Sequence, residues 1–159
     1  MKDSVPPARA GNAFLLAQLG AYAAQKFAER LAALELAPPQ AGILRIIAIT
    51  PGLSQQAVAH QLGTPPSRLV ALIDGLEQRG LIERRRNPDD RRHHALYLTE
   101  EGGRFMGRMA QVGMAHEDAI CAGLDDEERT RLNALLQRIA GKQGLTMFGH
   151  PGYDAVSGS

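Results

Sequence analysis

Apolar residues in the first part of the chain recur at steps of three and four, the period of an amphipathic helix. They predict one long helix over residues 10–35, about 25 residues and roughly 37 Å in length. A small domain does not need so long a helix for its own core, so we expect it to pack against a partner subunit. The repeating positions are Leu15, Leu16, Leu19, Tyr22, Ala23, Phe27, Leu31 and Leu34.

Two shorter helices are predicted next. A Pro-Pro pair at residues 38–39 opens the first, because proline suits the first helical turn, and the Thr-Pro-Gly sequence at 50–52 ends it. The second covers residues 55–62. Ser54 is its predicted N-cap, and Gly63 ends it because glycine tolerates a positive φ.

A fourth helix follows this glycine. Thr64 is its predicted N-cap and Pro65 its first helical residue, and Gly80 terminates it. Its apolar stripe is Leu69, Leu72, Ile73 and Leu76. A short helix, a glycine turn and a longer amphipathic helix have the form of a helix-turn-helix.

Two strand-like runs, residues 81–86 and 93–98, come directly after this pair. The turn sequence Asn-Pro-Asp-Asp at 87–90 joins them, since proline fixes φ and the Asn and Asp side chains bond to nearby backbone. A helix pair followed by such a hairpin is the outline of a winged helix-turn-helix, in which the hairpin is the wing.

The chain closes with two further predicted helices. Thr99 caps the fifth, which runs to about residue 122. Its glycines, Gly102, Gly103, Gly107 and Gly113, weaken it in isolation and would allow close helix contacts. Asp125 and Glu128 resemble a capping box for the sixth, which Gly141 ends. We predict a mainly α (α+β) fold: a winged helix-turn-helix with a two-stranded wing and long helices at both ends.

Charge is concentrated at the hairpin. The whole chain has a net charge of only +1, but residues 79–94 carry six arginines against three carboxylates, 6 − 3 = +3. A local positive field on a nearly neutral body suits a partner that is polyanionic at one place. A solubilising charge run is the alternative, and the adjacent helix pair makes duplex DNA the better interpretation.

Specific DNA contacts are expected from the start of the fourth helix and from the wing. Arg68 is the candidate for a bidentate contact to guanine. Arg91 is the candidate for insertion into the minor groove, and Asp90 is expected to orient the wing by holding Arg92 or Arg84. His93 either touches phosphate or is an idle surface residue. The full set of expected DNA contacts is Ser54, Thr64, Pro66, Ser67, Arg68, Arg84, Arg86, Arg91, Arg92 and His93.

These motifs together resemble the multiple antibiotic resistance regulator (MarR) family over roughly residues 36–102. The resemblance is carried by Pro39-Gln40 with Ile43-Leu44, by residues 54–62 and 69–80, by Arg84 with Asn-Pro-Asp-Asp-Arg-Arg at 87–92, and by Leu-Thr-Glu-Glu-Gly at 98–102. Many relatives carry basic residues where this chain has Ala71 and Gly75, so more of the electrostatic attraction is expected from the wing.

The resemblance implies a homodimer on a short palindromic double-stranded operator, usually as a repressor released by a small ligand or an oxidant. It implies residues 10–35 as the N-terminal dimerisation helix, 36–99 as the winged DNA-binding domain and 100–142 as the C-terminal dimerisation helices. Residues 1–9 and 143–159 are rich in Gly, Pro and Ser, and this composition predicts flexible tails.

By the same resemblance, an aromatic or phenolic effector would bind between the dimer helices and the winged domain. The candidate lining residues are Tyr22, Arg45, Met109 and His116. Three of them have an ordinary alternative: Tyr22 and Met109 suit a core, and Arg45 suits solvent or a carboxylate partner. Cys121 is a poor redox sensor, because it lies near a helix C-terminus and two acids that would raise its pKa.

Other classes are disfavoured. A single cysteine and the lack of an apolar leader favour the cytoplasm, and no run is long enough to span a membrane. No zinc spacing, phosphate loop or nucleophile elbow appears, so no metal, cofactor or enzyme activity is expected. The remaining alternative is a winged-helix module that binds protein and not DNA, which the arginine-rich hairpin argues against.

Overall fold

The computed structural model describes residues 9–87, 89–90 and 92–145. The order of helices and strands is the predicted one, and the winged-helix fold is confirmed. The elements are α1 (Asn12–Ala32), α2 (Pro38–Ile49), α3 (Gln55–Leu62), α4 (Pro66–Gln78), β1 (Ile82–Arg86), β2 (His94–Leu98), α5 (Glu100–Ile120) and α6 (Asp126–Lys142).

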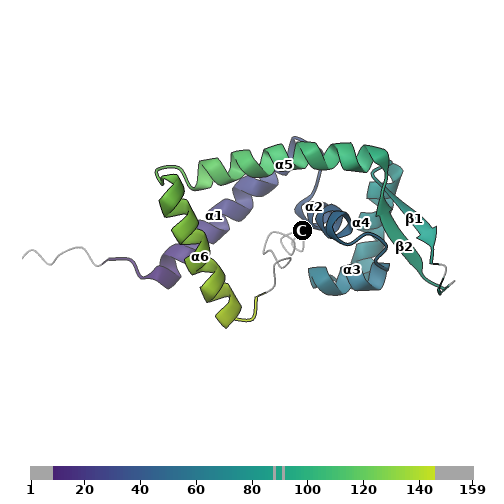
Figure 1. Ribbon diagram of the computed structural model, residues 1–159, viewed down its shortest axis with the longest axis horizontal. Helices are drawn as coiled ribbons and strands as arrows, with labels where there is room; N and C mark the ends of the chain where they lie inside the picture. Colours follow the sequence, from purple (N-terminus) through teal and green to yellow (C-terminus); the bar gives the residue numbers. More distant parts are fainter. Residues whose placement is uncertain (1–8, 88, 91, 146–159) are drawn as a thin grey trace, which may run out of the picture.

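Helix α5 connects two parts of the molecule (Figure 1). At one end lie α2, α3, α4 and the β1–β2 hairpin, which we call the reading head. At the other end lie α6 and the N-terminal part of α1, which with the adjoining part of α5 we call the arm. The hairpin is the outermost element of the reading head, and α6 lies at the opposite end of the molecule.

The hydrophobic core lies in the reading head and is centred on α2. Ile43, Leu44, Ile46 and Ile47 are fully buried there, and Arg45 between them is exposed. This helix is apolar on nearly every side because α1, α3, α4, α5 and β2 all pack around it. Its first turn is closed by Gln40, whose Oε1 accepts a hydrogen bond from the Ala37 N–H at 3.1 Å.

The wing is a two-stranded antiparallel sheet with Ile82 opposite Leu98 at its base and Arg86 opposite His94 at its tip. The segment before α3 adds to its edge. The Gly52 N–H donates to the Leu96 carbonyl at 2.8 Å, and the Leu96 N–H donates to the Leu53 carbonyl at 2.9 Å. The wing is therefore fixed to the start of the helix-turn-helix as well as to its end.

The junction between wing and α5 depends on a close backbone approach at Gly102. A Cβ atom at this position would lie 2.0 Å from the Leu81 carbonyl oxygen. The predicted cap of α5 is confirmed, since the Thr99 hydroxyl accepts from the Gly102 N–H at 2.9 Å. Gly103, Gly107 and Gly113 have nothing within 4 Å of such an atom, so the predicted close helix contacts are absent there within the described chain.

The arm is poorly buried. No residue of α6 is buried, and α1 buries only Leu31. Large apolar side chains that remain exposed on these helices and on α5 are Phe14, Leu15, Leu16, Leu19, Tyr22, Met114, Leu132, Leu135, Leu136 and Ile139. So many large apolar side chains left exposed on these helices are typical of an interaction site.

Several predicted boundaries were wrong. Helix α1 ends at Ala32, before the predicted residue 35, because Glu35 turns into a left-handed conformation with φ 53°. Helix α6 continues through Gly141 to Lys142, and the positive φ that ends it falls on Gly144. The tails predicted at 1–9 and 143–159 fall mostly outside the described residues. None of the described helices combines the length and apolar character needed to cross a bilayer.

Candidate nucleic-acid interface

The helix-turn-helix is formed by α3 and α4, and its local signals act largely as predicted. Ser54 caps α3, its Oγ accepting from the Ala57 N–H at 3.1 Å. Gly63 turns the chain with φ 65°. Buried residues of both helices, including Val58, face the core. As a result the first turn of α4 faces outward, with Pro66 and Ser67 exposed.

The predicted start of α4 needs correction. Pro65 is the N-cap and Pro66 is the first helical residue. The N-cap and the helix start therefore both lie one residue later than predicted. Thr64 is not a cap and is only 6% exposed. Its backbone N–H donates to the Ala59 carbonyl at 3.0 Å as the end of α3 turns inward. This burial argues against the DNA contact predicted for the Thr64 side chain.

Two more positions on α4 bear on how it would lie against DNA. Arg68 occupies its first turn and is half-buried. Gly75, where many relatives carry a basic residue, lies beside α2, and a Cβ atom there would be 3.3 Å from the Gln40 side-chain nitrogen. A side chain at residue 75 would therefore require the end of the Gln40 side chain to shift slightly.

The tip of the wing is organised by Asp90. Its Oδ1 accepts from the Arg92 backbone N–H at 3.0 Å and from Arg92 Nε at 3.3 Å, and its Oδ2 lies 2.9 Å from His93 Nδ1. These bonds, the one from the Arg92 backbone first and the one from His93 next, hold the pKa of Asp90 below its usual value. Arg92 itself stays 87% exposed.

His93 is held within the wing by Asp90, and the predicted contact of its side chain with phosphate stays a prediction. Before it in the turn, Asn87 Oδ1 accepts from the Asp89 N–H at 3.0 Å, which is the predicted side-chain turn chemistry. Arg91, the predicted minor-groove residue, lies outside the described residues.

Arg84 has a different role from the predicted one. Its guanidinium bonds to Asp74 and Glu77 on α4, and its Nε donates to Gln55 on α3 at 2.9 Å. The side chain is only 17% exposed. Arg84 is therefore held by the helix-turn-helix, is poorly placed to contact DNA, and is not the partner of Asp90.

The other wing arginines differ in how far their charge is balanced. Arg85 pairs with Glu83 and lies 4.3 Å above the Tyr97 ring centroid. Arg86, at the end of β1, is exposed. The surplus of positive charge offered to a partner is thus smaller than the arginine count suggests, and it is concentrated at the tip.

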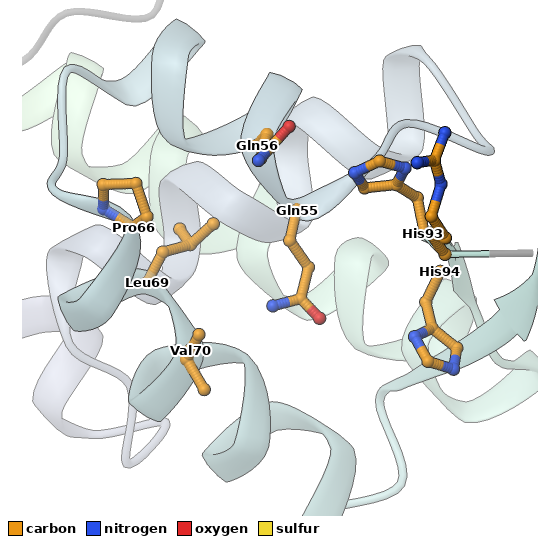
Figure 2. Close-up of a pocket in the computed structure, with 8 residues that line it drawn as sticks. Gln55, Gln56, Pro66, Leu69, Val70, His93 and His94 are labelled. Atoms are coloured by element: carbon orange, nitrogen blue, oxygen red, sulfur yellow. The ribbon is translucent and has the colours of Figure 1, made fainter. Parts of the chain in front are cut away.

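A groove of about 270 Å³ separates the wing from α4 (Figure 2). His93 and His94 approach it from the wing, Pro66, Leu69 and Val70 from α4, and Gln55 and Gln56 from α3. Five residues of this groove were not among the predicted DNA contacts: Gln55, Gln56, Leu69, Val70 and His94. Val70 is found by helical spacing, because it lies one turn after Pro66 on the same face. Nothing in the sequence singled out Gln55.

Of the four candidate effector residues, Tyr22 and His116 both lie near Arg30, whereas Arg45 and Met109 have other surroundings. Tyr22 is 53% exposed and lines a groove with Arg30 and Ile120, and Arg45 is exposed on α2. Met109 packs against the core. His116 lies against Phe27 with ring centroids 5.3 Å apart.

Cys121 is the C-cap of α5, and its Sγ lies 3.3 Å from Glu117 Oε1. Burial, and next the bond to Glu117, raise the pKa of this thiol, as expected from its position. The described residues include no cluster of three or more His, Cys, Asp or Glu that would hold a metal ion.

Comparison with known proteins gives consistent results. The sequence profile of the MarR family matches residues 34–93. A putative transcriptional regulatory protein for the hcr operon of Thauera aromatica is 36% identical over 123 residues, which are 77% of this chain and 73% of that protein.

Solved structures resemble the chain over most of its length. The transcriptional repressor CouR bound to a 23-mer DNA duplex is 32% identical, with a TM-score of 0.71 over 82% of this chain and 92% of that one. CouR from Rhodococcus jostii RHA1 bound to p-coumaroyl-CoA is 30% identical, with a TM-score of 0.66 over 80% and 90% of the two chains.

Proposed function

Because this chain belongs to the MarR family of transcriptional regulators, we propose that it binds a palindromic operator as a homodimer and represses transcription until a small ligand releases it. The observation that carries this proposal is the exposed first turn of α4 beside a wing whose tip carries Arg86 and Arg92. A helix start beside a cationic hairpin is suited to DNA, because the helix can enter the major groove while the hairpin reaches the neighbouring minor groove.

Within this proposal the contacts divide into two kinds. Ser67 and Arg68 on α4 face base edges, and Arg86 and Arg92 on the wing neutralise backbone or minor-groove charge. Two heads related by a two-fold axis would reach half-sites about 34–36 Å apart. Repression follows because the bound dimer occupies the promoter, and the site of action is the cytoplasm.

The dimer is supported by the apolar arm. The exposed leucines of α1 and α6 would bury each other across a two-fold axis, and each fully buried leucine contributes about 1.5–3 kcal/mol. Residues 10–35 and 100–142 would then be the dimerisation regions, as predicted from the family resemblance.

Release by a small ligand is supported by the neighbour that was solved with p-coumaroyl-CoA. An effector of this kind would prefer a dimer whose reading heads are wrongly spaced. A coupling free energy of about 1–3 kcal/mol would weaken operator binding roughly 5–150-fold. Tyr22, Arg45, Met109 and His116 remain candidates by family resemblance. No catalytic role is proposed.

The test is a fluorescence-polarisation titration of the full chain against DNA from upstream of its own gene, at two salt concentrations. We expect one protected palindrome, two protomers per site, a steep loss of affinity with salt, and binding at least about 10³-fold tighter than to random DNA. Absent or salt-insensitive binding would instead favour a winged-helix module that binds protein.

A further inference from the structure

The outward face of α4 carries almost no charge. In its first two turns the exposed residues are Pro66, Ser67, Val70 and Ala71. At 3.6 residues per turn these four side chains fall within an arc of about 140° on one side of the helix. The only basic residue of the whole helix, Arg68, is half-buried beside this arc. The helix that the proposed function places in the major groove therefore meets it with a largely apolar surface.

Val70 is the largest side chain of this surface. It is 43% exposed, although valine is among the residues most often buried in a core. The neighbouring Leu69 is buried in the core, so α4 is held against the body of the reading head by other residues. Figure 2 shows Val70 along one side of the groove, opposite His93 and His94 of the wing. Val70 is therefore exposed where the two DNA-contacting elements of the proposed function come together.

The next turn of α4 carries acids, but their charge is balanced. Asp74, which lies one turn after Val70 on the same face, and Glu77 both bond to the Arg84 guanidinium. An unpaired carboxylate at this place would repel the phosphates on either side of the major groove. With Arg84 as the shared partner, the apolar residues of the first two turns can approach the base edges without a repelling charge behind them.

We propose that the apolar surface of Pro66, Val70 and Ala71 reads thymine by contact with its C5-methyl group, and that Val70 is the main determinant of this preference. The inference rests on the proposed DNA binding. Among the four bases only thymine displays a methyl group in the major groove, where the other base-edge groups are hydrogen-bond donors and acceptors. An apolar side chain that covered those groups would leave them unsatisfied. The half-site should therefore place a thymine methyl group where Val70 lies.

Thymine recognition by Val70 is distinct from the contacts proposed for Ser67 and Arg68. Those two side chains carry hydrogen-bonding groups and suit polar base edges, with guanine the preferred partner of arginine. Val70 lies about 4.5 Å further along the helix axis than Ser67, at 1.5 Å per residue, so the two side chains touch different atoms of the DNA. The half-site should therefore contain polar and methyl-dependent positions that can be separated by experiment.

The expected size of the effect follows from the burial of one methyl group. Burying an apolar group of this size changes a binding constant roughly fourfold. A palindromic site meets the dimer twice, so removing the methyl group from both half-sites should weaken binding about 15-fold. The dependence of affinity on salt should stay the same, because no phosphate contact changes. This combination separates methyl recognition from the electrostatic contribution of Arg86 and Arg92.

The test replaces thymine with uracil, which keeps every hydrogen-bonding group of the base and lacks only the C5-methyl group. Operator duplexes carry uracil at one thymine position at a time, symmetrically in both half-sites, and are titrated with the full chain by fluorescence polarisation. We expect at least one position at which uracil weakens binding about 15-fold, and little effect in random DNA. At that position a 5-methylcytosine·guanine pair should bind more tightly than an unmethylated cytosine·guanine pair, which isolates the methyl group a second time.

Val70→Ala identifies the side chain responsible. This variant should bind the normal operator about as weakly as the wild type binds the uracil operator, with no further loss when uracil is present. Val70→Thr, which keeps the branched shape and one methyl group, should lose less. Ile49→Ala is the matched control, because Ile49 is an exposed apolar residue at the end of α2, and it should respond to uracil as the wild type does. Thermal unfolding of Val70→Ala should occur at no lower temperature, since Val70 is exposed and alanine favours helices.

Two results would overturn the inference: no position at which uracil weakens operator binding, or an undiminished effect of uracil in Val70→Ala. A shallower salt slope in Val70→Ala would also count against it, because the variant would then disturb phosphate contacts. The outcomes keep the two proposals apart. Operator binding that is intact but indifferent to uracil removes only the methyl recognition, whereas the absence of specific binding to any upstream DNA removes the proposed function as well.

Discussion

Arg84 on β1 and Asp74 on α4 form an ion pair that joins the wing to the reading helix. Glu77, one turn further along α4, holds the same guanidinium, and Gln55 brings in α3. The wing therefore has a fixed position relative to the helix that would enter the major groove. The ion pair joins α4 and β1, which are adjacent in the sequence. These two elements need a fixed relative orientation if both are to contact DNA.

The first prediction concerns this tie. Arg84→Met should destabilise the fold by about 1 kcal/mol and weaken operator binding, yet leave the slope of affinity against salt unchanged, because the residue positions the wing without neutralising phosphate. Chemical denaturation and polarisation titrations measure both. A double-mutant cycle with Asp74→Asn should give a coupling energy of about 0.5 kcal/mol or more. A salt slope that becomes shallower by the amount expected for one phosphate contact would show that Arg84 contacts DNA.

The second prediction separates base reading from backbone contact. Arg68→Ala should cost about 1–3 kcal/mol on the operator and relax preference at one base step, with little effect on random DNA. Arg86→Ala should weaken operator and random DNA alike and make the salt slope shallower by about one. Competition titrations with single-base operator variants decide this. Equal losses on both DNAs for Arg68→Ala would remove its base-reading role.

The third prediction concerns assembly. Leu19→Glu on α1 and Leu135→Glu on α6 should convert the dimer to monomer at micromolar concentration, because each places a charge in the apolar surface of the arm. Sedimentation velocity measures the mass. Ile49→Glu is the matched control: this residue is also an exposed apolar side chain, but it is at the end of α2 in the reading head. Dimers in both arm variants would contradict the proposed interface.

The fourth prediction compares two neighbouring glycines at the start of α5. Gly102→Ala should cost about 1–3 kcal/mol or more, because its Cβ would lie 2.0 Å from the Leu81 carbonyl oxygen. Gly103→Ala meets nothing within 4 Å and should stabilise the helix by about 0.5–1 kcal/mol. Thermal unfolding of the two variants should therefore shift in opposite directions, and a common direction would show that the junction can relax.

The fifth prediction is a pH dependence. The folded-state pKa of His116 lies below its unfolded value near 6.5, so the unfolded chain binds a proton more readily. The contribution of His116 to stability is full above this value and is lost as the pH falls toward the folded-state pKa. His116→Gln should flatten the stability profile between pH 7 and 5 relative to wild type. Parallel profiles in urea unfolding would show that His116 does not contribute.

Much of the fold was predictable because its signals are local. Ser54, Gly63, Thr99 and the Asp125 capping box act on backbone groups within four residues, so sequence spacing alone identifies them. The start of α4 was wrong by one residue because three consecutive residues, Thr64 to Pro66, all suit a helix start. Their competition is settled by the burial of Thr64, which is a tertiary effect.

The site was less predictable. Five arginines between residues 84 and 92 look equivalent in sequence. Arg84 differs from the others because it bonds to side chains on α3 and α4, which lie 7 to 29 positions away in the sequence.

Of the four described arginines in the wing, three already have a carboxylate beside them. Few condensed ions would be displaced when such a surface meets an arbitrary duplex. The regulator should consequently dissociate quickly from non-cognate DNA. Its residence time at a site would then depend more on how well the base sequence fits the two reading heads than on the electrostatic attraction of the DNA backbone.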